Sequence, residues 1–395
     1  MRILHVTDFF PPVRGGLEGH VDDLAGAQTT LGHDVHVATM TTSPVPSHHD
    51  VVPHVVRSAS SRVLPYEDPD RRFHPPVPDP LARRELRRVI DDVRPDVIHA
   101  HTWLGVSLPR TTGVPLVLTA HDYALVCQLH TLHRTTDEPC KGPSLTACMA
   151  CARRRDGMLR TALMTPTTVI GRRLLRPDAV LTLSRHVAEV LRPYVTAPID
   201  VCGGLLSAGG APTAVPRGLP TTPFVLFAGD PSPHKGIDVL IDAWRDTRLA
   251  GVALVVAATR PIDRSMPNLT VVHLDRSEMA SAWHAATLAV VPSRWAEPFG
   301  MSAMEALAAG TPVVASDAGA LGEVVRDGVD GVLVPPGDAG ALAGAVRALL
   351  DDTDRRARFA DAARAGAARF GPAVVAGRVD AVYERVVRAA RASVA

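Results

Sequence analysis

The segment Ala296–Ala306, AEPFGMSAMEA, decides the fold of its half of the chain. Its two glutamates bracket the turn residues Pro298-Phe299-Gly300-Met301, the strand-like run Leu288–Pro292 precedes it, and an Ala/Leu/Met helical pattern follows. This order predicts a strand, a glycine-containing turn and the start of a helix. The first N–H groups of a helix have no intrahelical partners and carry the positive end of its dipole, so the turn is suited to a diphosphate.

The two glutamates occupy different parts of this predicted unit. Glu297 lies on the turn, where it can accept hydrogen bonds from sugar hydroxyls, whereas Glu305 lies more than one turn into the helix, within reach of a ribose diol. Ionised carboxylates bind vicinal hydroxyls well because their two oxygens accept charge-assisted hydrogen bonds. The segment therefore favours a sugar nucleotide as ligand.

Length and composition limit the classes of protein. The 395 residues, 46% of them hydrophobic, are enough for two domains with sizeable cores. A formal net charge of +1 argues against a general nucleic-acid binder. The chain has no long apolar run and no signal-peptide region, and a strand at Arg2–Val6 begins at once. We therefore expect a soluble cytoplasmic protein.

Short apolar runs alternate with helical patterns, which predicts two doubly wound parallel-sheet α/β domains. The predicted strands are Ile3–Val6, Val35–Thr39, Val97–Ala100, Leu116–Thr119, Val180–Leu183, Val225–Ala228, Ala253–Ala257, Thr270–Leu274, Leu288–Val291, Val313–Ala315 and Val332–Val334. A Gly/Pro-rich linker at 203–222 separates domains at 1–202 and 223–371, and 372–395 forms a final helix.

The E-x7-E pattern of Glu297 and Glu305 resembles the signature of the retaining glycosyltransferases of family 4, which have the GT-B fold. Further segments extend the resemblance over nearly the whole chain, namely PPVRGGLEGHV (11–21), TAHDY (119–123), LTLSRHVAEVL (181–191), FAGDPSPHKGIDVLIDAW (227–244) and GTPVVASDAGALGEVVRDGVDGVLVPPGD (310–338). The resemblance implies two Rossmann-like domains facing a cleft, with the last helix crossing back to the first domain. It also implies retaining transfer of a sugar from a nucleotide-diphosphate sugar, with UDP or GDP, to an acceptor hydroxyl on the first domain.

The resemblance also assigns roles to individual residues. The implied catalytic residues are His121, Lys235 and Glu297, with Lys235 neutralising charge on the departing diphosphate. The implied donor-binding residues are Gly16, Arg260, Leu274, Phe299, Gly300, Met301, Ser302 and Glu305. The implied acceptor-binding residues are Gly15, Asp122 and Tyr123.

Two features separate this chain from common patterns. Gly15, Gly16 and Gly19 do not fit G-x-G-x-x-G, which argues against a dinucleotide oxidoreductase. The family typically has an arginine where this chain has Asp230, and an acidic residue cannot hold a phosphate. We expect either that His234, Arg260 or Arg294 compensates or that donor binding differs from the usual pattern of the family.

Four cysteines lie within 25 residues, at Cys127, Cys140, Cys148 and Cys151. They can supply the ligands of a tetrahedral structural zinc in an insertion at 127–151, with His130 and His133 as substitute ligands. An iron–sulfur cluster, disulfides and free thiols are the alternatives. No catalytic metal is expected, because in the resembled family helix N-termini and lysine take its electrostatic role.

Arginine-rich helical segments at 80–93 and 153–176 are compatible with two interpretations: weak contact with the inner face of a membrane, or solvated helix faces with internal salt bridges. The i,i+4 pairs Arg87–Asp91 and Arg88–Asp92 favour the second interpretation. Two other functions remain open besides transfer. One is a GT-B sugar-nucleotide 2-epimerase, and the other is a sugar-nucleotide-binding protein without turnover, which Asp230 would favour.

Overall fold

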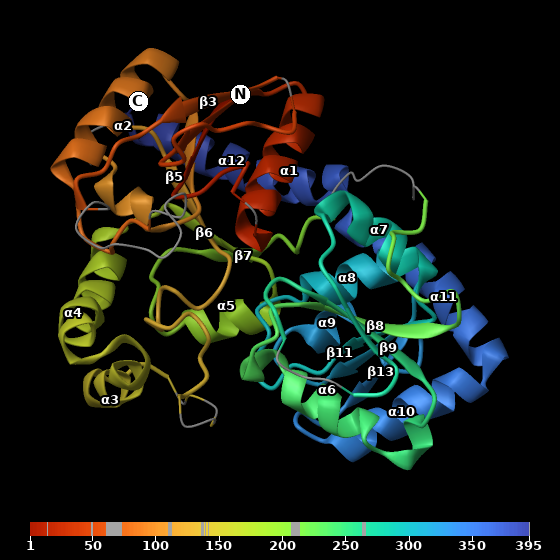
Figure 1. The fold of residues 1–395 in the computed structure, drawn as a ribbon. Coiled ribbons are helices and arrows are strands. Elements are labelled where there is room, and N and C mark those ends of the chain that lie inside the picture. The colour runs from red at the N-terminus through yellow and green to blue at the C-terminus, as the bar shows by residue number, and fades with distance from the viewer. Residues whose placement is uncertain are drawn as a thin grey trace. The chain divides into compact units, whose positions relative to one another are not determined.

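The computed structural model describes residues 1–13, 15–48, 50–60, 73–109, 113–135, 138, 140, 142–206, 214–262 and 266–394. The chain forms two compact units (Figure 1). Unit 1 comprises Met1–Ser207 and Pro372–Ala395, and unit 2 comprises Ala208–Gly371. Residues 207–213 of the predicted linker lie outside the described part of the chain.

Unit 1 contains a seven-stranded parallel sheet in the order β3-β2-β1-β4-β5-β6-β7. Its strands are β1 (Arg2–Thr7), β2 (Asp34–Thr39), β3 (Val51–Val55), β4 (Val97–Ala100), β5 (Leu116–Ala120), β6 (Ala179–Thr182) and β7 (Ile199–Val201). The inner strands are largely buried and mostly apolar, with His5 on β1 and His99 on β4 among the exceptions, because helices cover both faces of a parallel sheet.

Helices complete unit 1. They are α1 (Gly16–Thr30), η2 (Trp103–Ser107), α2 (Pro80–Val93), α3 (Leu145–Asp156), α4 (Met158–Leu174), α5 (Arg185–Leu191) and α12 (Pro372–Val394). Helix α2 begins at Pro80 because the Asp79 carboxylate accepts hydrogen bonds from the first free N–H groups. The last helix, α12, packs beside α1 and so belongs to unit 1, as the fold class predicted.

Unit 2 contains a six-stranded parallel sheet in the order β10-β9-β8-β11-β12-β13. Its strands are β8 (Phe224–Gly229), β9 (Ala253–Ala258), β10 (Leu269–Val272), β11 (Leu288–Val291), β12 (Val313–Ser316) and β13 (Gly331–Val334). Its helices are η3 (Pro233–Lys235), α6 (Ile237–Trp244), η4 (Thr247–Leu249), α7 (Arg276–Ala285), α8 (Met301–Ala308), α9 (Leu321–Val324), α10 (Ala339–Asp351), α11 (Thr353–Ala367) and η5 (Ala368–Phe370).

Both sheets reverse their strand order at one point, between β1 and β4 in unit 1 and between β8 and β11 in unit 2. In open α/β sheets, ligands bind beyond the carboxyl ends of the strands at such a switch point. The prediction of two doubly wound domains is confirmed. Two strands, β3 and β7, were not predicted, and both are edge strands.

Candidate active site

Lys235 and Glu297 form an ion pair at the carboxyl end of the unit 2 sheet. The Lys235 Nζ donates hydrogen bonds to both carboxylate oxygens of Glu297, at 2.8 and 3.0 Å. Lys235 follows β8 and Glu297 follows β11, so the two side chains meet at the switch point. Glu297 is only 6% exposed, whereas the Lys235 side chain keeps 29% of its surface accessible. Two of the three predicted catalytic residues are therefore in direct contact.

The Glu297 carboxylate is held in one orientation by two further donors. Ser293 Oγ donates to Oε2 at 3.0 Å, and the Trp295 indole N–H donates to the same oxygen at 2.7 Å. The Lys235 ammonium also lies 4.7 Å from the centre of the Trp295 ring. A cation over an indole face gains a cation–π interaction, so Trp295 positions both members of the pair.

The turn that follows Glu297 depends on Gly300, whose φ of 100° is accessible mainly to glycine. Gly300 precedes α8, and the first N–H groups of this helix are unpaired within the helix. Ser302 Oγ donates to the Ala228 carbonyl at 3.1 Å, which ties the start of α8 to β8. The positive end of α8 therefore lies at the carboxyl end of the sheet, as predicted for a diphosphate site.

The Phe299 side chain does not fit its predicted role in donor binding. It is 5% exposed and packs edge-to-face against Phe370, with ring centroids 5.7 Å apart. A buried ring presents no surface to a ligand, so this side chain stabilises the turn from below. The backbone at Phe299 remains the part of this residue that a donor could contact.

Two predicted contacts of the nucleoside are partly exposed. Glu305 lies on α8, where the Trp283 indole N–H donates to its Oε2 at 3.3 Å. Leu274 lies in the loop between β10 and α7. The indole orients the Glu305 carboxylate from within the unit, and the predicted contact of Glu305 with a ribose stays a prediction.

Asp230 and Arg260 form an ion pair where β8 and β9 end. The Arg260 Nε donates to Asp230 Oδ1 at 2.7 Å, and a terminal guanidinium nitrogen lies 2.5 Å from the same oxygen. Arg260 is thus engaged by Asp230 itself, and its predicted role as a replacement phosphate ligand stays a prediction. A paired guanidinium has less capacity for phosphate than a solitary one.

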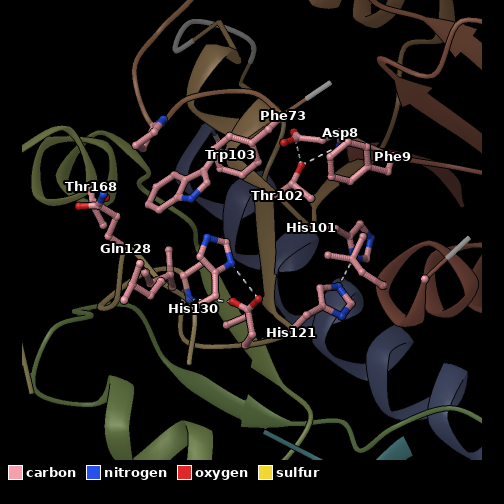
Figure 2. Close-up of a pocket in the computed structure, with 18 of the residues that line it drawn as sticks. Asp8, Phe9, Phe73, His101, Thr102, Trp103, His121, Gln128, His130 and Thr168 are labelled. Atoms are coloured by element: carbon pink, nitrogen blue, oxygen red, sulfur yellow. Dashed lines mark hydrogen bonds and ion pairs between the residues drawn. The ribbon is translucent and has the colours of Figure 1, made fainter. Parts of the chain in front are cut away.

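Unit 1 contains a cavity of about 490 Å³ at its own switch point (Figure 2). Asp8 follows β1, His101 and Thr102 follow β4, and His121 follows β5. The predicted residues Gly15, Gly16, His121 and Asp122 all line this cavity, together with Phe73, Trp103, Gln128, His130, Arg155 and Arg160. The structure therefore brings these four predicted residues of the first domain together, beside aromatic and charged side chains.

Asp122 and His130 form an ion pair in the cavity wall, with Asp122 Oδ2 3.0 Å from His130 Nδ1. Burial alone would raise the pKa of Asp122, but the neighbouring His130 lowers it. Burial alone would lower the pKa of His130, but Asp122 raises it. His130 has a φ of 65°, a conformation that a non-glycine residue adopts at an energetic cost. The pair is therefore charged more readily than its burial suggests.

The Tyr123 side chain does not fit its predicted contact with the acceptor. It is fully buried and packs edge-to-face against the His186 ring at a centroid distance of 6.2 Å. Although Tyr123 adjoins His121 and Asp122 in sequence, its side chain enters the core of unit 1 and does not line the cavity.

The four clustered cysteines are free thiols, each partly buried. Burial raises the pKa of Cys127 and of Cys148, so these thiols are protonated near pH 7 unless a cation stabilises the thiolates. Within the described ranges, three or more ligand atoms within 4.8 Å of one another occur only at His5, His99 and His101. Residues 136, 137, 139 and 141 of the insertion are outside the description. The structural zinc thus stays a prediction, and its binding would have to draw the thiols together.

Protein purified without added metal is expected to contain about one zinc per chain. Elemental analysis measures this, and Cys148→Ser should remove the metal. Cys202→Ser is the matched control, because Cys202 lies apart from the cluster and is buried. Four titratable thiols and no metal would contradict the prediction, while visible absorbance would indicate iron–sulfur.

Several residues around both sites were not predicted. They are Asp8, His101, Trp103, Trp283, Ser293 and Trp295. Asp8 is almost fully buried; burial raises its pKa, while a hydrogen bond from Thr102 Oγ1 at 2.6 Å works against that rise. Three of them could have been predicted from their position, because Asp8, His101 and Ser293 each lie within two residues of the carboxyl end of a strand. Trp283 lies in a helix and has no such position.

Two family models match successive parts of the chain. "Glycosyltransferase Family 4" matches residues 14–202, and "Glycosyl transferases group 1" matches residues 216–366. The first match falls within unit 1 and the second within unit 2.

Similar proteins cover nearly the full chain. A glycogen synthase of Mycobacterium tuberculosis is 32% identical over 92% of this chain and 89% of its own length. A D-inositol 3-phosphate glycosyltransferase of Thermobispora bispora is 31% identical over 95% of this chain and 91% of its own. The structure of Anabaena HepE with UDP-glucose has a TM-score of 0.66 at 19% identity, covering 98% of this chain and 100% of that one.

Proposed function

This chain belongs to the family 4, group 1 glycosyltransferases, and from that premise we propose that it is a retaining hexosyltransferase using a nucleotide-diphosphate sugar without a catalytic metal. The Lys235–Glu297 pair beside the start of α8 carries this proposal. It combines a cation and free helical N–H groups, which suit a diphosphate, with a carboxylate, which suits sugar hydroxyls.

In the proposed reaction, the bond between sugar C1 and the phosphate oxygen breaks as the acceptor hydroxyl oxygen bonds to C1 from the same face. The hydroxyl proton passes to the departing phosphate oxygen, so no protein nucleophile is needed. Lys235 and the N–H groups of α8 stabilise the charge that develops on the diphosphate. Glu305 binds the ribose, Glu297 binds the sugar hydroxyls, and His121 in unit 1 contacts a substrate hydroxyl.

UDP is the proposed nucleotide, because a structural neighbour of this chain has been solved with UDP-glucose. Thermal unfolding in the presence of UDP-, GDP- and ADP-sugars tests this, since a ligand that binds the native state raises its melting temperature. The product of transfer should keep the anomeric configuration of the donor, as seen by NMR. Inversion at C2 with donor alone would instead identify an epimerase, and binding without transfer to any acceptor would identify a sugar-nucleotide sensor.

Glu305→Ala is expected to weaken binding of the sugar nucleotide by about 1–3 kcal/mol, the contribution of a hydrogen bond to a charged group. Titration calorimetry with UDP measures the effect. Glu305→Gln is the matched control, because it keeps the size of the side chain and removes only its charge, and it should lose less affinity. Donor affinity unchanged in Glu305→Ala would remove this residue from the donor site.

We also propose that the α3–α4 pair contacts the inner surface of an anionic membrane from the cytoplasm. Met158 and Leu159 are each 78% exposed at the start of α4, and arginines end α3. Exposed apolar side chains beside cations suit the boundary between lipid headgroups and acyl chains. Among the helices of the described ranges, none has the length and apolar character needed to cross a bilayer.

Sedimentation with phosphatidylglycerol vesicles tests the membrane contact. The wild-type protein should sediment with these vesicles and not with phosphatidylcholine vesicles. The double variant Met158→Ser/Leu159→Ser should not sediment with either kind of vesicle. Val374→Ser is the control, because Val374 is an exposed apolar residue on α12. Equal sedimentation of the wild type and the double variant would contradict the contact.

A further inference from the structure

A chain of hydrogen bonds runs through unit 1 from α12 to the cavity. Gln28 Oε1 lies 2.8 Å from His5 Nε2, His5 Nδ1 lies 2.9 Å from His101 Nε2, and His101 Nδ1 lies 3.0 Å from His121 Nε2. At its far end, Gln28 Nε2 lies 3.1 Å from the Asp380 carboxylate. The last link, between His101 and His121, is visible in Figure 2.

The carboxylate of Asp380 determines which atom donates in each of these hydrogen bonds. An ionised carboxylate only accepts hydrogen bonds, so the Gln28 atom that faces it must be the amide nitrogen. His33 Nε2 lies 2.9 Å from the other Asp380 oxygen and donates to it. The Gln28 carbonyl oxygen is then turned toward His5, and it can only accept. His5 must therefore carry its proton on Nε2.

The three histidines are neutral near pH 7, so each carries a single ring proton. Burial lowers the pKa of His5 to about 4 and that of His121 to about 4, and it lowers the pKa of His101 well below its ordinary value. With its proton on Nε2, His5 offers Nδ1 as an acceptor, so His101 must donate from Nε2. By the same step, His121 must donate to His101 from its own Nε2.

We propose that Asp380, acting through Gln28, His5 and His101, fixes His121 in the Nε2–H tautomer. The Nδ1 of His121 is then a lone pair that accepts a hydrogen bond from a substrate hydroxyl. His121 lines the cavity, and in the described part of the chain no protein group bonds its Nδ1. The four residues behind it are positioning residues. The role of the lone pair rests on the proposed function, whereas the tautomer itself does not.

The same region has a second interpretation as a metal site, because ligand atoms of His5, His99 and His101 lie within 4.8 Å of one another. All six ring nitrogens, however, already have hydrogen-bond partners. His99 is bonded at 2.6 Å to the Tyr383 hydroxyl and at 2.6 Å to Thr119 Oγ1. A metal would have to break these bonds, and it would also interrupt the chain to His121. The hydrogen-bonded interpretation is therefore favoured.

Two-bond ¹⁵N–¹H spectra of the full chain, labelled at histidine, test the proposal directly. Neutral Nδ1–H and Nε2–H rings give different nitrogen shifts, and the His121 signals are those lost in His121→Gln. We expect His5, His101 and His121 all to be Nε2–H in the wild type. An Nδ1–H signal from His121, or displacement of the His5, His99 and His101 signals by added zinc, would overturn the proposal.

A matched pair of variants tests the coupling. His101→Asn places an amide oxygen near the position of Nδ1 and keeps an acceptor for His121, whereas His101→Leu does not. His101→Leu should give mixed tautomers at His121 and a turnover lowered by roughly tenfold to a hundredfold, comparable to losses caused by removing groups that orient a ligating histidine. His101→Asn should restore the tautomer and most of the turnover. Identical His121 signals in both variants would refute the coupling.

The outcomes separate this proposal from the proposed function. If no transfer is found and His121 is Nε2–H, the transferase assignment fails and the tautomer chain stands. If transfer is found and His121 is Nδ1–H, the transferase assignment stands and the proposed tautomer chain fails. Thermal unfolding of both variants shows whether each is folded, and the wild-type spectrum decides the tautomer without any variant.

Discussion

Lys235→Ala is expected to lower turnover by about two to three orders of magnitude, the usual loss when a group that stabilises developing charge is removed. The Lys235 ammonium stabilises the negative charge that appears on the diphosphate as its bond to the sugar breaks. Its contribution is therefore greater in the transition state than in the bound donor, and turnover should fall more than donor affinity. Steady-state kinetics and calorimetry with UDP measure the two effects separately.

Lys235→Ala also affects stability, because Glu297, which is 6% exposed in the wild-type protein, would lose its counter-charge. Removing one partner of a buried pair typically destabilises a protein by about 3–5 kcal/mol. Lys235→Arg keeps the charge and controls for this effect, while Lys235→Ala with Glu297→Gln removes the unpaired carboxylate. A variant with normal turnover and only a raised Michaelis constant would mean that Lys235 binds ground state and transition state equally.

Gly236→Ala is expected to destabilise the protein more than Gly251→Ala, its matched control. Both glycines have a φ of 80°, so both substitutions carry the cost of a left-handed residue, about 1–2 kcal/mol. A Cβ at Gly251 would meet nothing within 4 Å, whereas at Gly236 it would lie 1.8 Å from the Pro292 carbonyl oxygen. Overpacking of this kind adds about 1–3 kcal/mol. Urea unfolding of both variants measures the difference.

The clash at Gly236 also concerns the site. Gly236 follows Lys235 directly, and Pro292 precedes Ser293, which holds Glu297. A backbone shift that relieves the clash would displace Lys235 or Glu297 from the geometry of the ion pair. Gly236→Ala should therefore lose turnover even where it is folded, and Gly251→Ala should not. Equal unfolding free energies for the two variants would contradict the assigned clash.

The sequence predicted the buried strands well and failed at the edges of the unit 1 sheet. Strands such as β11 and β12 were recognisable because both faces are covered, which leaves a short, fully buried run of mainly apolar residues. The edge strand β3 contains Pro53 and His54 and is half exposed, and the edge strand β7 is only three residues long. Neither has the pattern that burial on two faces imposes.

The site was predictable where function depends on backbone position, and less so where it depends on side-chain direction. The motif correctly placed Glu297 and Gly300 at a strand–helix turn, but it could not show that Phe299 and Tyr123 point into the core. The pairing of Lys235 with Glu297 joins residues 62 positions apart, and the Gln28–Asp380 contact joins residues 352 positions apart. Such contacts arise from the packing of distant strands and helices, which no local pattern encodes.

The position of helix α12 in the sequence determines which unit can complete its folding first during synthesis. Unit 1 begins with β1, yet its Gln28 side chain meets Asp380 only after all of unit 2 has left the ribosome. Domains generally fold as units while the chain emerges. Unit 2, a continuous segment of sequence, can therefore reach its native state first, whereas unit 1 cannot cover the α1 surface that packs against α12 until α12 has emerged. A nascent chain stalled before α12 should bind chaperones through unit 1 although its unit 2 is already folded.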